Sequence, residues 1–119
     1  MSKIKDTLQE LRRTAGIKGA ALLTTDGLVA AEALDERFPS DVVAGLSSYL
    51  LMTTNRSLDE GGLGACSQFT LHATHGRAVF VALEDSYLVV LFDQFADVDA
   101  ARAEVDEAVQ RIRRTARLA

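Results

Sequence analysis

Residues 77–92 read RAVFVALEDSYLVVLF, and this stretch decides the fold of the 119-residue chain. Its two halves, 78–83 and 87–92, are apolar at both odd and even positions. Successive side chains of a strand point to opposite faces of its sheet, so a strand that is apolar at both parities is covered on both faces. The stretch therefore predicts two central strands that lie between two layers of helices.

The rest of the chain supplies the other elements. Apolar spacing near 3.6 residues predicts helices, short apolar or alternating runs predict strands, and glycines mark the breaks. The expected elements are a helix over 3–14, strands over 17–25 and 28–33, a helix from Ser40 to the glycines at 61–64, strands over 67–74, 77–83 and 86–92, and a helix from Asp97 onward. We expect one domain over 1–119 of the α/β (α+β) class, in the order α-β-β-α-β-β-β-α, with five mainly antiparallel strands.

Short polar segments predict where the elements join. Asp26-Gly27 is a turn dipeptide that accepts positive φ, so the first two strands should form a hairpin. Ser40 is expected to cap the middle helix, with Asp41 near the positive end of the helix dipole.

The three predicted helices differ in how their apolar residues are arranged. The first has a narrow stripe of Ile4, Leu8 and Leu11 among charged residues, and the last is similar. In the middle helix we expect the apolar residues near helical spacing to form one wide face: Val42, Val43, Leu46, Tyr49, Leu50 and Leu58, widened by Leu51 and Met52.

The strand over 67–74 alternates cleanly, with Phe69 and Leu71 on one side and polar residues on the other, which predicts the sheet edge farthest from the hairpin. Edge strands are usually protected by charge, proline or a bulge, and this one has none of these. We expect a second copy to pair with it about a two-fold axis, giving a homodimer.

The middle helix of each copy would then pack beside the joined sheet. The alternative is that its residues only cover the chain's own sheet. The candidate interface residues are Leu46, Tyr49, Leu50, Thr53, Phe69 and Leu71.

Composition excludes several classes of protein. Thirteen Lys and Arg against 17 Asp and Glu give a formal net charge of -4, which argues against nucleic-acid binding. No apolar run approaches the roughly 20 residues of a membrane helix, and the N-terminus has no signal-peptide pattern, so we expect neither membrane insertion nor export. The single Cys66 forms no internal disulfide, which suits a cytoplasmic protein.

No residue pattern predicts catalysis, a metal or a cofactor. On a strand, the offset between His72 and His75 points them to opposite faces, and His75 falls in a turn. Cys66 has no local signature of a nucleophile. The glycines at 61–64 lack the Lys-Ser/Thr ending of a phosphate loop and precede a strand. We therefore expect a protein that is not an enzyme.

Each group of arginines could either be part of the solvated surface or contact a partner. Arg56 and Arg77 are isolated near the middle of the chain and are expected to be surface residues rather than groups that enter a partner's site. A basic C-terminal turn either complements the helix dipole or contacts an acidic partner or lipid; it contains Arg111, Arg113, Arg114 and Arg117.

The stretch GIKGAALLTTDGLVA at 16–30, together with the element order and length, resembles the Roadblock/LC7 family, whose first hairpin commonly has a small-residue strand followed by Asp-Gly-Leu. The resemblance covers nearly the whole chain. It implies a profilin-like three-layer α/β/α sandwich and a homodimer joined edge to edge. It also implies a non-enzymatic interaction module that binds and modulates or scaffolds a Ras-like small GTPase.

Such a module would act by positioning its partner's own switch residues, because the family brings no catalytic motif of its own. An alternative is a small-molecule sensor domain, since profilin-like sheets of related shape also form ligand pockets. An internal cavity lined by polar groups would favour that alternative.

Overall fold

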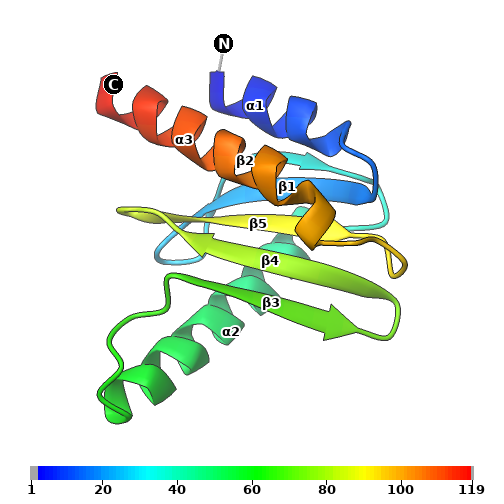
Figure 1. The fold of residues 1–119 in the computed structure, drawn as a ribbon. Coiled ribbons are helices and arrows are strands. Elements are labelled where there is room, and N and C mark those ends of the chain that lie inside the picture. Colours follow the sequence, from blue (N-terminus) through cyan, green and yellow to red (C-terminus); the bar gives the residue numbers. More distant parts are fainter. Residues whose placement is uncertain (1–2, 119) are drawn as a thin grey trace.

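A computed structural model describes residues 3–118, with side chains up to Thr115, so Arg117 lies outside the described side chains. The elements follow the expected order (Figure 1). They are α1 (Lys3–Arg12), β1 (Ile17–Thr24), β2 (Val29–Leu34), α2 (Ser40–Glu60), β3 (Gln68–Ala73), β4 (Gly76–Ala82), β5 (Ser86–Phe92), the 3-10 turn η1 (Asp99–Ala101) and α3 (Arg102–Leu118).

The five strands form one antiparallel sheet in the order β2-β1-β5-β4-β3. The first hairpin lies on one side of the sheet and β3 forms the opposite edge, as the alternation of β3 predicts. β4 and β5 are inside the sheet and largely buried, which confirms the prediction from their double-sided apolar pattern. Gly27 adopts a φ of 88° in the β1–β2 turn, where an added Cβ would lie 2.9 Å from the Ser48 hydroxyl of α2.

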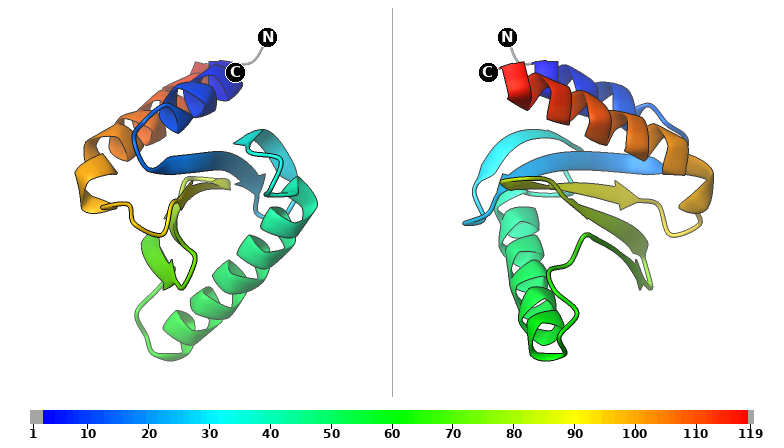
Figure 2. Two further views of the ribbon diagram at one scale, coloured as in Figure 1. Left: turned by 90° about the vertical axis from the view of Figure 1, so that its right-hand side faces the viewer. Right: turned by 60° about the vertical axis from the view of Figure 1, so that its left-hand side comes forward.

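Helices cover both faces of the sheet. α1 and α3 lie side by side on one face, and α2 crosses the other (Figure 2). The core beneath α1 and α3 is centred on Leu8, Leu88 and Val90, and all three side chains are fully buried. A smaller core beneath α2 contains Leu51 and Phe80. The three-layer α/β/α prediction is therefore confirmed.

Two details at the start of α2 differ from the sequence prediction. Ser40 does not cap the helix, since no side-chain hydrogen bond caps this end and Pro39 holds the N-cap position. The Pro39 carbonyl already accepts hydrogen bonds from the backbone N–H groups of Val42 and Val43, at 3.1 and 3.0 Å. The helix thus begins one residue earlier than a Ser40 cap requires. Asp41 lies in the first turn, as predicted.

The prediction that the apolar residues of α2 form one wide face is wrong, because they lie on two opposite sides of the helix. The residues that α2 buries against the sheet are Ala44, Ser47 and Leu51, with Val43 and Leu50 partly buried beside them. Val42, Leu46 and Tyr49 lie on the opposite side and are exposed. Ala44 and Ser47 on the inner side let the helix approach the sheet, and Leu51 fills the core beside them. α2 is therefore apolar on two faces.

Candidate functional site

The outer face of α2 is apolar and open to solvent. Val42, Leu46 and Tyr49 follow one another at offsets of four and three, so they line one side of the helix. Their exposed fractions are 58%, 59% and 62%. Met52 is also exposed, next to this line. A row of large apolar side chains in solvent is typical of a protein interaction surface rather than of a free helix face.

Charge is absent from the same stretch. No charged residue occurs from Val42 to Asn55, and the flanking charges are Asp41 and Arg56. Most exposed helix faces carry charged residues that keep them in water. A face without charges is suited to contact with another apolar surface.

β3 offers a free sheet edge next to α2. It pairs with β4 on one side, and no strand among the described residues pairs with its other side. The Ser67 carbonyl accepts a hydrogen bond from the Ala82 N–H at 2.9 Å. Backbone groups of an antiparallel strand alternate in direction, so those of Gln68, Thr70 and His72 point away from β4. They form the row of donors and acceptors that a further strand would pair with.

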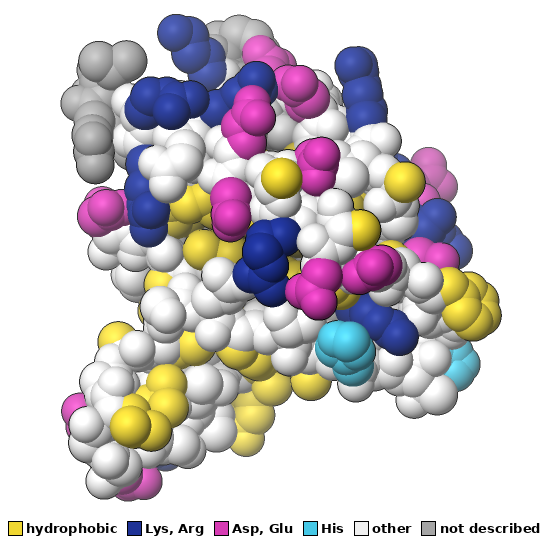
Figure 3. Space-filling view, in the orientation of Figure 1, with side chains coloured by type: hydrophobic (Ala, Val, Ile, Leu, Met, Phe, Trp, Pro, Cys, Tyr) yellow, Lys and Arg dark blue, Asp and Glu magenta, His cyan; other side chains and the backbone are white. Residues whose placement is uncertain are grey.

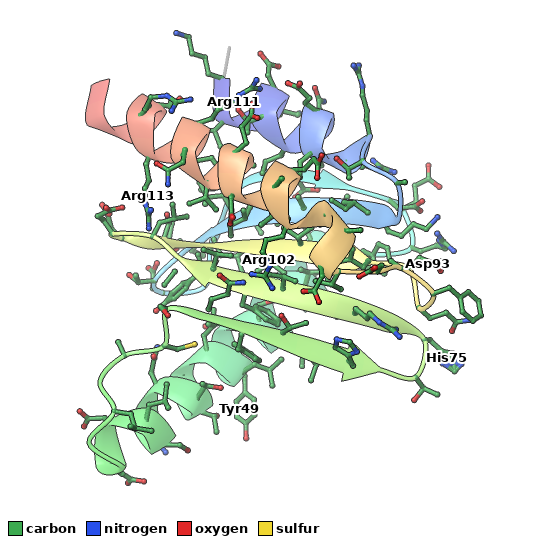
Figure 4. The ribbon with its side chains drawn as sticks, viewed as in Figure 1. Tyr49, His75, Asp93, Arg102, Arg111 and Arg113 are labelled. Carbon is green, nitrogen blue, oxygen red and sulfur yellow. The ribbon has the colours of Figure 1, made fainter. Side chains whose placement is uncertain are left out.

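The side of β3 that faces α2 extends the apolar surface. Phe69 packs against the core beneath α2 and stacks on Phe80, with 4.6 Å between ring centroids. Leu71 shares that side and is 39% exposed. Hydrophobic side chains line the border of the molecule between α2 and β3 (Figure 3). Tyr49 projects away from the sheet toward the side on which β3 has its free edge (Figure 4).

The candidate residues from the sequence thus occupy one region, although not equally. Leu46, Tyr49, Thr53 and Leu71 are exposed, whereas Leu50 and Phe69 are half-buried against the core beneath α2. Sequence reasoning missed the outer location of Val42 and Met52. The signal that could have found Val42 is its spacing from Leu46 and Tyr49 in a stretch without charges.

Asn55 joins the two parts of this region. Its side-chain Oδ1 accepts a 2.7 Å hydrogen bond from the backbone N–H of Cys66, just before β3. Its Nδ2 lies 3.5 Å from the hydroxyl of Tyr87 on β5. One amide on α2 therefore holds both the chain that leads into β3 and the sheet behind it.

A depression lies between α1 and α3, with a volume of about 350 Å³. Arg111 spans its rim, because its guanidinium contacts Glu10 on α1 at 2.7 Å and Glu107 on α3 at 3.1 Å. The hydrogen bond to Glu10 and the two carboxylate charges raise the pKa of Arg111. This is a surface groove between helices, with Arg111 paired to two of its carboxylates, rather than the internal polar cavity expected of a small-molecule sensor.

One carboxyl group outside the groove also has a shifted pKa. The backbone N–H of Arg37 donates a hydrogen bond to Asp35, and the guanidinium groups of Arg37 and Arg12 lie nearby. Together they lower the pKa of Asp35, the backbone hydrogen bond most of all. Asp35 therefore links the β2–α2 connection to α1.

The chemistry-bearing residues do not converge. Both His72 and His75 are exposed, and Cys66 is buried as a free thiol. Within residues 3–118, no three His, Cys, Asp or Glu side chains group as metal ligands would. None of the helices in that range has the length and hydropathy needed to cross a membrane. Arg56 is exposed and Arg77 is half-buried.

Comparison with protein families gives one match that covers most of the chain. Residues 3–92 match the model of the Roadblock/LC7 domain. The chain is also 30% identical over 110 residues to the "uncharacterized protein MJ1340" of Methanocaldococcus jannaschii, and this alignment covers 92% of the chain and 96% of the relative.

Solved structures with the same fold include three informative neighbours. Myxococcus xanthus MglB superposes with a TM-score of 0.85 at 16% identity, covering 94% of this chain and 93% of that one. A structure described as MglB with tetrameric arrangement superposes with a TM-score of 0.83 at 19% identity, covering 98% of this chain and 93% of that one. Profilin II of Acanthamoeba castellanii superposes with a TM-score of 0.63 at 12% identity, covering 93% of this chain and 94% of that one. The sheet and its two helical layers are therefore profilin-like.

Proposed function

Because the chain belongs to the Roadblock/LC7 domain family, we propose that it is a homodimeric, non-enzymatic module that binds a Ras-like small GTPase and modulates or scaffolds it. The observation that carries the proposal is the open apolar surface formed by the outer face of α2 and the free edge of β3. Family membership supplies the class of partner. The lack of converging titratable groups within the described residues supports binding rather than catalysis.

Self-association accounts for both parts of the surface at once. Two copies related by a two-fold axis at β3 would pair Gln68, Thr70 and His72 with a second strand, which satisfies their outward backbone groups. The same axis would bring the apolar face of α2 against its symmetry mate. The tetrameric arrangement described for one MglB structure supports self-association in proteins of this fold.

The GTPase partner would bind the assembled dimer through surface that pairing leaves free. Its hydrolysis machinery is its own, so the module would change the rate or the location of the GTPase by holding its switch segments. Arg56 and Arg77 are not required as inserted groups in this scheme. The proposed site of action is cytoplasmic.

Two measurements test the proposal. Sedimentation equilibrium of the chain at micromolar concentration should show a dimer of the 12.8 kDa subunit. Thr70→Pro should shift it to monomer, because proline removes an outward N–H and obstructs a neighbouring strand. Thr70→Val keeps the N–H and the branched shape and should remain dimeric.

Binding to the partner is measured separately. Ras-like small GTPases from the same genome, loaded with GDP or with a non-hydrolysable GTP analogue, are titrated into the chain by calorimetry. At least one nucleotide state should bind, and the GTPase reaction should be followed with and without the chain. Absence of binding in both states would remove the GTPase from the proposal and leave only self-association.

A further inference from the structure

Two unpaired charges flank the apolar face of α2. Asp41 precedes Val42, and Arg56 lies two helical turns beyond Tyr49 on the same side of the helix. Both side chains are exposed. Among the described residues neither makes an ion pair, although Asp59 and Glu60 are close to Arg56 along the helix. An acid at one end and a base at the other make this face self-complementary in one orientation only.

That orientation follows from the two-fold axis. The inference about the orientation of the two helices rests on the self-association proposed above. An axis that pairs β3 with a second β3 antiparallel runs perpendicular to the sheet, so both α2 helices lie on the same side of the joined sheet and run in opposite directions. The C-terminal half of α2 extends past β3 toward the region that the second copy would occupy (Figure 1).

The apolar residues select the register of the two helices. With Tyr49 at the axis, Leu46 lies opposite Met52 and Thr53 of the partner subunit, so apolar and uncharged side chains meet throughout the centre. A register centred on Thr53 would instead place Leu46 opposite Glu60 of the partner subunit. Burying a carboxylate against leucine without a partner is unfavourable. The register at Tyr49 avoids this contact.

We propose that two copies pack α2 against α2 with Tyr49 at the axis, and that Asp41 of each copy forms an ion pair with Arg56 of the partner subunit. The symmetry repeats the pair at both ends of the contact. A parallel arrangement would place acid against acid and base against base, so the charges select the antiparallel dimer as well as its register. They also favour a second copy of this chain over a related chain that lacks either charge.

Charge exchange tests the pairing directly. Asp41→Arg and Arg56→Asp should each raise the dissociation constant of the dimer about tenfold at low salt, because like charges then meet at both ends. The double variant should return to within about threefold of the wild type. An equal mixture of the two single variants should also dimerise better than either alone, since each supplies the charge that the other needs. Sedimentation equilibrium measures all four samples.

Glu104→Arg is the matched control for Asp41→Arg, because it makes the same change of net charge on an exposed site of α3. Its dissociation constant should stay within about twofold of the wild type. Thermal unfolding checks that each variant keeps its fold. The ion pair is overturned, while self-association stands, if the single variants dimerise as tightly as the wild type. It is overturned equally if neither the double variant nor the mixture restores the dissociation constant. A monomeric wild type overturns both. Loss of GTPase binding alone leaves the pairing intact.

Discussion

The helices on the two faces of the sheet present different surfaces to their surroundings. α1 and α3 place acidic and basic side chains over their outer sides (Figure 3), and within their described side chains no large hydrophobic residue is exposed. α2 exposes Val42, Leu46, Tyr49 and Met52 and carries no charged residue between Asp41 and Arg56. The helices on one face of the sheet therefore present charged groups to water, whereas the helix on the other face presents large apolar side chains.

The comparison separates apolar side chains that are buried when the subunit folds from those that only a partner could bury. Leu8 of α1 is fully buried within the chain, whereas Leu46 of α2 is 59% exposed in the single subunit. Apolar area contributes about 25 cal/mol per Å² when it leaves water. For Leu8 that contribution is made when the subunit folds. For Leu46 most of it is available only when a partner binds.

The largest difference in the free energy of unfolding should appear when Leu8 and Leu46 are each replaced by alanine. Leu8→Ala should lower the free energy of unfolding of the subunit by about 3 kcal/mol, because it leaves a cavity beneath α1. Leu46→Ala should change it by about 0.5 kcal/mol or less, since the side chain is already in water. Urea denaturation at concentrations below the dimer dissociation constant measures both. Equal losses would mean that the outer face of α2 belongs to the subunit's own core.

A smaller effect is expected at the rim of the α1–α3 groove. Arg111→Gln removes the contacts with Glu10 and Glu107, which are exposed and screened by salt. The melting temperature should fall by about 2 °C or less at low salt, and by still less at high salt. Calorimetry at two salt concentrations checks this. A large loss that salt does not reduce would show that ion pairing, rather than the core, holds α1 to α3.

The smallest effect at neutral pH should come from Asp35. The backbone hydrogen bond from Arg37 holds the folded-state pKa of Asp35 below its ordinary value of 3.8. A lowered carboxyl pKa gives a contribution to stability that is fully present above the unfolded-state pKa and is lost as the pH falls through the folded-state pKa. Asp35→Asn should therefore make unfolding less dependent on pH below about 4. Urea titrations from pH 7 to pH 2 measure the slope. An unchanged slope would contradict this role of Asp35.

The sequence was sufficient for the layers and for placing the first hairpin on one side of the sheet and β3 at the far edge. Apolar residues at both parities in β4 and β5 require cover on both faces, and the alternation of β3 assigns it to an edge. In α1 and α3, charged residues mark the outer side, so the buried stripe is unambiguous. These are local patterns whose meaning does not depend on distant contacts.

The orientation of α2 was not predictable in the same way. Apolar residues occur around much of its circumference, and without charges no side is marked as the outer one. The helix places Ala44 and Ser47 inward, where small side chains fit close to the sheet, and Leu51 packs into the core beside them. That arrangement depends on tertiary packing. Leu46 and Tyr49 could thus be named as candidates, while Val42 and Met52 were missed.

The hydrogen bond from Cys66 to Asn55 bears on the kinetics of association. Binding is slowed and weakened when loops must first be immobilised, and a surface that is already rigid avoids that entropic cost. Here a single amide fastens the lead-in of β3 to α2 before any encounter takes place. We therefore expect an incoming molecule to meet a preorganised strand and helix, with an association rate limited by diffusion and orientation rather than by loop rearrangement.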